Sequence, residues 1–410
     1  MDQLPALNPV GRDKNSAFSY LLLPLFPVDH LPAPILLLHT DHFQNLGCIS
    51  GHPVKTLRPG PEFFYLPGKR TAPAAFRILQ KPYAGIQLDG AKGAGFDMLL
   101  TANNHCNDTD LPGVLRTVQV IRERGMKALG TNLDSSEQKY HIQDINGIRI
   151  GMVCYTYDDS KDPNQVTFNY HPLPKDSSDL VCSFPKFSAS KSREPFYEQL
   201  NGQISEMRQK GADAIVVFLH WGEEYHLEPT GDQKEMAQRL CNMGVDLIVG
   251  GHPHVVEPVE LLSSTENPEH KTVCLYSLGN AVSNQRREEM TSQKSGHTED
   301  GMLFNITFQK YSDNSVYLSG VEVIPTWVNK FANPEGKREY NILPLDNSMR
   351  DMWQTMFSLD DAVYQKAVES YGRTMNIAGA GVEASNEWLS RRLPQKETPA
   401  ETQAEIHTQP

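Results

Sequence analysis

Four histidines and a pair of asparagines stand directly after short apolar runs of this chain. They belong to three motifs, Asn103-Asn104-His105, His220-Trp221-Gly222 and Gly251-His252-Pro253-His254. Neutral imidazoles and an amide oxygen suit Zn, Fe or Mn better than Mg or Ca. A lone histidine is more often a surface or core residue than a ligand, whereas three such motifs together favour a shared metal site.

The apolar runs before these motifs predict buried strands at residues 96–101, 213–219 and 246–249. The other predicted elements are helices at 111–125, 194–210 and 232–243, strands at 148–155 and 273–277, and a hairpin over 302–308 and 315–325. Strands buried on both faces that alternate with helices indicate an α/β layered core. Because open α/β sheets place ligands at the carboxyl ends of their strands, we expect the four histidines and Asn104 to meet on one rim.

Composition narrows the class of protein. The 410 residues suffice for one large domain with additions or for two domains, and 39% hydrophobic residues can form a sizeable core. A net charge of -12 argues against a nucleic-acid partner, which usually requires a basic face. Six scattered cysteines without a CxxC pair indicate reduced thiols or core residues rather than disulfides or a cysteine zinc site.

Both ends of the chain differ from its middle. Residues 1–90 hold twelve of the 28 prolines and show no sustained helical or strand periodicity. Residues 17–28 resemble a signal peptide only faintly, because Pro24 and Pro27 interrupt the apolar run, and no run is long enough to span a membrane. From about residue 385 the composition predicts a disordered tail.

Five strings of residues occur in the order seen in one known family. They are LTANNHCND at 100–108, VVFLHWGEEY at 216–225, DLIVGGHPHVVEPVE at 246–260, YSLGNAV at 276–282 and VEVIPTWV at 321–328. Residues 93–345 thereby resemble the CapA family of poly-γ-glutamate capsule synthesis proteins, within the calcineurin-like metallophosphoesterases. The resemblance implies an α/β fold in the form of a four-layer αββα sandwich, followed by a helical extension at 346–384 and a tail at 385–410.

The resemblance also implies a chemistry. Two divalent metal ions, of Mn, Fe or Zn, would activate a bridging hydroxide and bind the oxygens of a phosphoester substrate. The metal ligands implied by the motifs are Asn104, His220, His252 and His254.

Further roles follow from the same resemblance. His105 would donate a proton to the leaving group or stabilise developing charge, and Asp108 would orient His105 through a hydrogen bond. Glu224 would act as a base or as a residue of the metal shell, and a solvated loop acid is an equal alternative. Asn103 and Asn280 are predicted to bind substrate, although turn formation accounts for Asn280 as well.

The acidic motifs with which the family begins, G-D-x-M and N-L-E, are absent from residues 1–95. Three interpretations of residues 1–92 stay open: a divergent but functional region, loss of the motifs, or poorly ordered residues translated from a shifted reading frame. The abrupt change in proline content favours the shifted frame. Without acidic ligands, the site should bind one metal weakly or none.

The sequence leaves three functions open. The first is a CapA-like protein of poly-γ-glutamate synthesis or export with phosphoesterase-type hydrolase activity. The second is a non-catalytic subunit that binds this anionic polymer, or assembles a membrane-bound synthase complex. The third is a general metallophosphoesterase acting on a small phosphorylated metabolite. The resemblance implies a membrane-associated or cell-surface location, whereas the lack of a visible anchor leaves the cytoplasm open.

Overall fold

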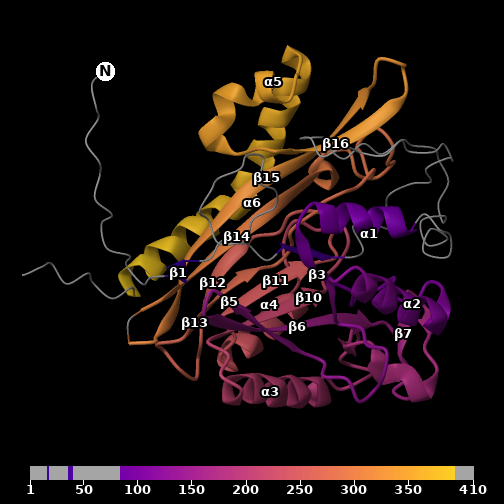
Figure 1. Ribbon diagram of the computed structural model, residues 1–410, viewed down its shortest axis with the longest axis vertical. Coiled ribbons are helices and arrows are strands. Elements are labelled where there is room, and N and C mark those ends of the chain that lie inside the picture. The colour runs from indigo at the N-terminus through magenta and orange to yellow at the C-terminus, as the bar shows by residue number, and fades with distance from the viewer. Residues whose placement is uncertain (1–15, 18–35, 40–83, 312, 393–410) are drawn as a thin grey trace, which may run out of the picture.

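The computed structural model describes residues 16–17, 36–39, 84–311 and 313–392 (Figure 1). The predictions for residues 1–92 therefore lie outside the described residues, apart from two short strands and the first helix. That helix, α1 (Ala84–Gly93), packs Leu88 and Ala91 against Phe96. The folded core therefore includes residues before the expected domain start at residue 93.

A mixed sheet of seven strands forms the centre of the protein. Across the sheet they are β12 (Val259–Ser263), β13 (Lys271–Leu275), β11 (Leu247–Gly251), β10 (Ala214–His220), β6 (Ile148–Asp158) and β5 (His141–Ile145), with β9 (Ser183–Pro185) also paired to β6. The inner strands run parallel, and the edge strands β5 and β12 are antiparallel to their neighbours. Every residue of β10 is buried, which explains its continuous apolar sequence.

Two helices cover one face of this sheet. They are α3 (Glu194–Gln209) and α4 (Gly231–Asn242), which lie at the positions expected from helical periodicity. Leu200 of α3 and Leu240 of α4 share a buried cluster with Val217 of the sheet. Figure 1 shows α3 below the central strands.

A second, four-stranded sheet packs on the opposite face. Its strands in order are β1 (Ser16–Ala17), β14 (Asp300–Lys310), β15 (Val316–Ala332) and β16 (Arg338–Pro344). The predicted hairpin is confirmed, since β14 and β15 pair antiparallel. Phe304 and Phe308 of β14 join Met152 of β6 in one buried cluster, so this core lies between the two sheets.

A third sheet carries the first chemical motif. Three parallel strands form it: β2 (Leu36–His39), β3 (Phe96–Leu100) and β4 (Lys127–Leu129). The helix α2 (Asp110–Glu123) connects β3 to β4 and buries Val114 and Val118. Shorter elements complete the loops: β7 (Thr167–Phe168), β8 (His171–Pro172), η3 (Lys175–Leu180) and η4 (His297–Glu299).

The C-terminal part of the described chain is helical. It comprises η5 (Asn347–Met352), α5 (Trp353–Met356) and the long helix α6 (Asp361–Arg392). α6 lies along β15 and β12 (Figure 1). The expected tail boundary at residue 385 is wrong, because Ser385 and Leu389 are buried and the helix continues to Arg392.

These elements confirm the predicted α/β class, in the form of a mixed α/β fold around a mixed central sheet. In the part of the chain that the structure describes, no helix combines the length and the apolar character needed to cross a bilayer.

Candidate functional site

The three predicted motifs meet at the ends of strands that belong to two different sheets. His220 ends β10 and pairs in register with Gly251 of β11, so His220 and His252 emerge from neighbouring strands. Asn104 follows β3 of the three-stranded sheet, and its Oδ1 lies 2.9 Å from His220 Nε2. The strands that carry the motifs therefore belong to two sheets, and the site lies where these sheets come together.

The Gly-His-Pro-His loop holds its histidines in an unusual backbone conformation. The ring centroids of His220 and His252 are 4.7 Å apart, and those of His252 and His254 are 6.2 Å apart. His252 and His254 have φ values of 102° and 59°. Such left-handed conformations cost of order 1–3 kcal/mol in a non-glycine residue and cluster at functional sites. At Gly250 a Cβ would lie 1.9 Å from the Tyr276 carbonyl oxygen, which explains the glycine before the loop.

Tyr157, near the end of β6, is a site residue that the sequence analysis missed. Its hydroxyl lies 3.3 Å from His252 Nε2, and its ring centroid is 6.0 Å from that of His220. The Lys186 ammonium lies 4.6 Å from the centroid of the ring. Burial raises the pKa of the Tyr157 phenol above its ordinary value, and the nearby charge of Glu224 raises it further. The neutral hydroxyl is thus a permanent hydrogen-bonding group beside the histidines.

His105 and Asp108 form the predicted pair. His105 Nδ1 lies 2.9 Å from Asp108 Oδ2, and both side chains are partly exposed. Asn169, from the turn between β7 and β8, places its Nδ2 3.2 Å from the same ring nitrogen and 3.5 Å from Asp108 Oδ1. The geometry that would orient a proton-donating imidazole is therefore present, with Asn169 as an additional member.

The two asparagines expected to bind substrate make hydrogen bonds to the protein. Asn103 is buried, and its Oδ1 accepts from the backbone N–H of His105 at 2.9 Å. Asn280 is also buried, and its Oδ1 lies 3.0 Å from His254 Nδ1. Its Nδ2 donates to the carbonyl oxygens of His254 and Thr298, each at 3.0 Å. Both side chains shape the loops that carry the histidines.

Glu224 is exposed, but its loop packs on the histidine loop. The backbone N–H of Tyr225 donates to the Pro253 carbonyl oxygen at 2.7 Å, and the Tyr225 ring stacks on His254 with centroids 5.9 Å apart. Glu224 therefore borders the site without a hydrogen bond in the described structure that would fix a catalytic role.

A buried acid, Glu257, connects the chain after the histidine loop to helix α4. Glu257 is fully buried, and its Oε2 accepts from Gln233 Nε2 at 2.8 Å. Gln233 also accepts from the Thr230 backbone N–H at 2.8 Å and so closes the N-terminal cap of α4. Burial raises the pKa of the Glu257 carboxyl to about 8, and the charge of Glu228 adds to the effect.

A second buried acid ties α6 to the loop that carries Asn280. Arg373 donates two hydrogen bonds to the Asp300 carboxylate, at 2.6 and 2.8 Å, and Ser370 Oγ donates a third at 2.6 Å. The backbone carbonyl of Asp300 accepts from the N–H of Asn280 at 3.0 Å. Asn280 in turn contacts His254, so α6 supports one of the predicted ligands through a short chain of contacts.

The chemistry of the donor set fits a transition metal in part. Two ligand atoms on one ion, each about 2.1 Å from it and roughly at right angles, lie about 3 Å apart. The 2.9 Å between Asn104 Oδ1 and His220 Nε2 is close to this spacing and is also an ordinary hydrogen-bond distance. However, the described residues contain no group of three His, Cys, Asp or Glu side chains arranged to hold a metal. The four predicted metal ligands are neutral side chains, so they carry no negative charge that could balance the positive charge of a metal ion.

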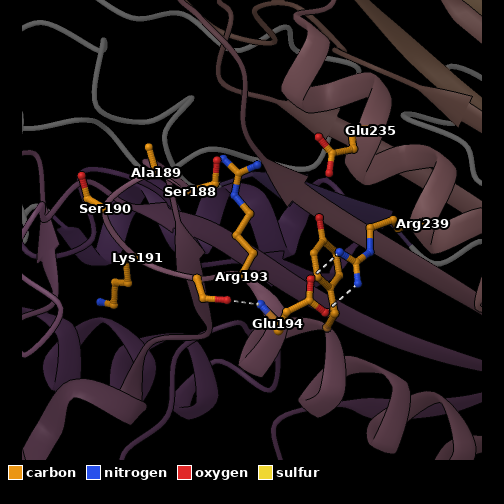
Figure 2. Close-up of a pocket in the computed structure, with 10 residues that line it drawn as sticks. Ser188, Ala189, Ser190, Lys191, Arg193, Glu194, Glu235 and Arg239 are labelled. Atoms are coloured by element: carbon orange, nitrogen blue, oxygen red, sulfur yellow. Dashed lines mark hydrogen bonds and ion pairs between the residues drawn. The ribbon is translucent and has the colours of Figure 1, made fainter.

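A separate surface cavity of about 310 Å³ lies near the start of α3 (Figure 2). Its two arginines are already paired: Arg239 with Glu194 at 2.6 Å, and Arg193 with Asp232 at 2.7 Å. None of the predicted site residues lines this cavity. We therefore assign it no part in the chemistry of the histidines.

The fold and the site together define a mixed α/β protein with imidazole and amide groups gathered at its strand ends. Residues 84–285 match the family model described as "Bacterial capsule synthesis protein PGA_cap". The match lies in the region that carries the sequence strings and confirms the resemblance to this family that those strings predicted.

Two curated relatives are similar to part of the chain. The chain is 30% identical over 196 residues to "PGA biosynthesis protein CapA" of Bacillus subtilis (strain 168), which covers 47% of this chain and 44% of the relative. It is 28% identical over 202 residues to "Capsule biosynthesis protein CapA" of Bacillus anthracis, covering 47% of this chain and 42% of the relative. The matched segments thus span less than half of these relatives.

One solved structure is a distant match. It is described as "Termus thermophilus Sulfate thiohydrolase SoxB in complex with glycerol", with a TM-score of 0.34 and 13% sequence identity, over 73% of this chain and 40% of that chain.

Proposed function

We propose that this protein acts in poly-γ-glutamate capsule synthesis or export and catalyses metal-dependent hydrolysis of a phosphoester-type bond. The observation that carries the proposal is the meeting of Asn104, His220 and His252 at one place, beside the His105–Asp108 pair. The match to the family model and the names of the two relatives supply the capsule context. A four-layer αββα arrangement of the metallophosphoesterase type is part of the same proposal.

Each group has a chemical task in this scheme. Asn104, His220, His252 and His254 would hold one or two divalent ions, of Mn, Fe or Zn. The bound ion would supply Lewis-acid catalysis and lower the pKa of a water molecule.

The His105–Asp108 pair would handle the proton. Asp108 accepts a hydrogen bond from Nδ1 of His105, which stabilises the imidazolium form and leaves Nε2 to donate its proton to the leaving oxygen. Tyr157 and Asn280 would fix the orientation of His252 and His254.

The purified full chain with bis(p-nitrophenyl) phosphate and Mn²⁺ tests this proposal. His105→Ala should lower kcat by about 100-fold or more, because it removes a general acid. His226→Ala is the matched control, since His226 is an exposed histidine in the loop between β10 and α4. Elemental analysis should find bound Mn, Fe or Zn. Turnover that is equal with and without metal would contradict the scheme.

A non-catalytic role is the second candidate. The absence, among the described residues, of three clustered His, Cys, Asp or Glu side chains favours it. In that case the domain would bind the anionic polymer or help to assemble a membrane-bound synthase complex at the cell surface. Co-sedimentation with poly-γ-glutamate by a metal-free, catalytically silent chain would favour this role over hydrolysis.

A further inference from the structure

The hairpin β7–β8 lies directly against the proton-donating pair. Asn107, between His105 and Asp108 in sequence, donates from Nδ2 to the carbonyl oxygens of His171 and Pro172 at 3.1 and 3.2 Å. Asn169, in the turn of the hairpin, lies 3.2 Å from His105 Nδ1. Contacts at both the turn and the second strand fix the position of the hairpin relative to His105.

The turn of this hairpin carries an unfavourable residue. Asn169 and Tyr170 have φ values of 49° and 65°, as in a turn with two left-handed central residues. Asparagine tolerates this conformation and glycine is preferred at the second position, whereas a tyrosine there is strained. Tyr170 is also 84% exposed, so burial of its ring does not compensate for the strain.

Two acids at the end of β6, Asp158 and Asp159, accept hydrogen bonds from the hairpin. The backbone N–H of Tyr170 donates to Asp159 Oδ2 at 3.0 Å, and the Thr167 hydroxyl donates to Asp159 Oδ1. The backbone N–H of Thr167 donates to Asp158 Oδ1 at 2.9 Å. These bonds hold the backbone of Tyr170 in place, while its ring is exposed to solvent.

We propose that the hairpin Thr167–Pro172 is a substrate-binding element of the hydrolytic site. Asn169 is a positioning residue: it donates to Asp108, which in turn orients His105. Tyr170 determines specificity by packing its ring against a planar or apolar part of the group that leaves the phosphoester. This inference rests on the proposed function and names the side of the site on which the leaving group lies.

Two glycine variants separate these roles, because glycine keeps the left-handed turn while it removes the side chain. With bis(p-nitrophenyl) phosphate, Tyr170→Gly should raise KM about 5-fold, the loss of one aromatic contact. It should also raise Tm by about 2 °C, because strain is relieved. Asn169→Gly should lower kcat about 10-fold with KM unchanged. Tyr170→Phe should restore the wild-type KM.

A binding measurement distinguishes failure of this inference from failure of the proposed hydrolysis. Isothermal titration of the Mn²⁺-loaded chain with bis(p-nitrophenyl) phosphate should show weaker binding by Tyr170→Gly, whereas inorganic phosphate, which lacks a leaving group, should bind both proteins equally. Weaker binding without turnover by either protein would retain the binding role and reject hydrolysis. Equal affinity of wild type and Tyr170→Gly for the diester, or no affinity in either, would overturn the role of Tyr170.

Discussion

Replacement of the buried acid Glu257 by glutamine should make the protein more stable at neutral and alkaline pH. The carboxyl has its pKa raised by burial from 4.5 to about 8, so folding favours its protonated form. Above pH 4.5 the unfolded chain releases this proton while the folded chain retains it. With respect to this group, the free energy of unfolding is highest below pH 4.5, where the carboxyl is protonated in both states. It falls as the pH rises towards 8.

The size of the effect follows from the two pKa values. A shift from 4.5 to about 8 corresponds to a loss of about 5 kcal/mol once the folded form has ionised, and to about 3 kcal/mol at pH 7. Glutamine has the shape of the acid, stays neutral, and keeps an oxygen that can accept from Gln233. Glu257→Gln should therefore remove the pH-dependent loss while the packing is preserved.

Urea unfolding of both proteins, followed by circular dichroism from pH 4.5 to 8, measures this effect. The difference in the free energy of unfolding should be near zero at the acid end and should grow steadily with pH. Glu228→Gln is a suitable control, because Glu228 is exposed and only adds charge near Glu257. A difference that does not change with pH would refute the reasoning, since it would mean that Glu257 ionises equally in both states.

Two further substitutions test the supports of the site. Arg373→Met should lower the free energy of unfolding by about 3–5 kcal/mol, because it leaves the buried Asp300 carboxylate without its counter-charge, and thermal unfolding would detect this loss. The exposed pair on the same helix is the control, and Arg391→Met should change stability by less than about 0.5 kcal/mol. Tyr157→Phe should weaken Mn²⁺ binding about 10-fold, measured by isothermal titration, because His252 loses its hydroxyl neighbour. Unchanged affinity would mean that the hydroxyl does not orient this ring.

Much of the fold could be predicted because its central strands have continuous apolar sequences. The run at 213–219 matches β10 closely, since a strand buried on both faces has no polar positions to obscure it. The hairpin of β14 and β15 could be predicted for a different reason, because the turn residues Asp313 and Asn314 lie between its two strands. The assignment of β3 to a different sheet from β10 could not be predicted, because strand pairing depends on contacts far apart in sequence.

The candidate site was only partly visible in the sequence. His220 and His252 stand out because a polar ring directly follows an apolar run. Tyr157 did not stand out, since a tyrosine in a strand can equally be a core residue. Asn169 and Tyr170 lie in a polar stretch where a two-residue turn is unexpected, because the second turn position lacks the usual glycine. The prediction of a tail from residue 385 relied on composition and overlooked Leu389.

The ion pair between Arg373 and Asp300 also has a consequence for the order of events during synthesis. A nascent chain leaves the ribosome with its amino end first, and its segments begin to fold as they emerge. The strand that begins at Asp300 is therefore made long before its arginine partner on α6. Until that helix docks, the carboxylate of Asp300 stays in contact with water. The loop that joins Asn280 to His254 therefore gains its full set of supporting contacts only after the last helix of the described chain has been made.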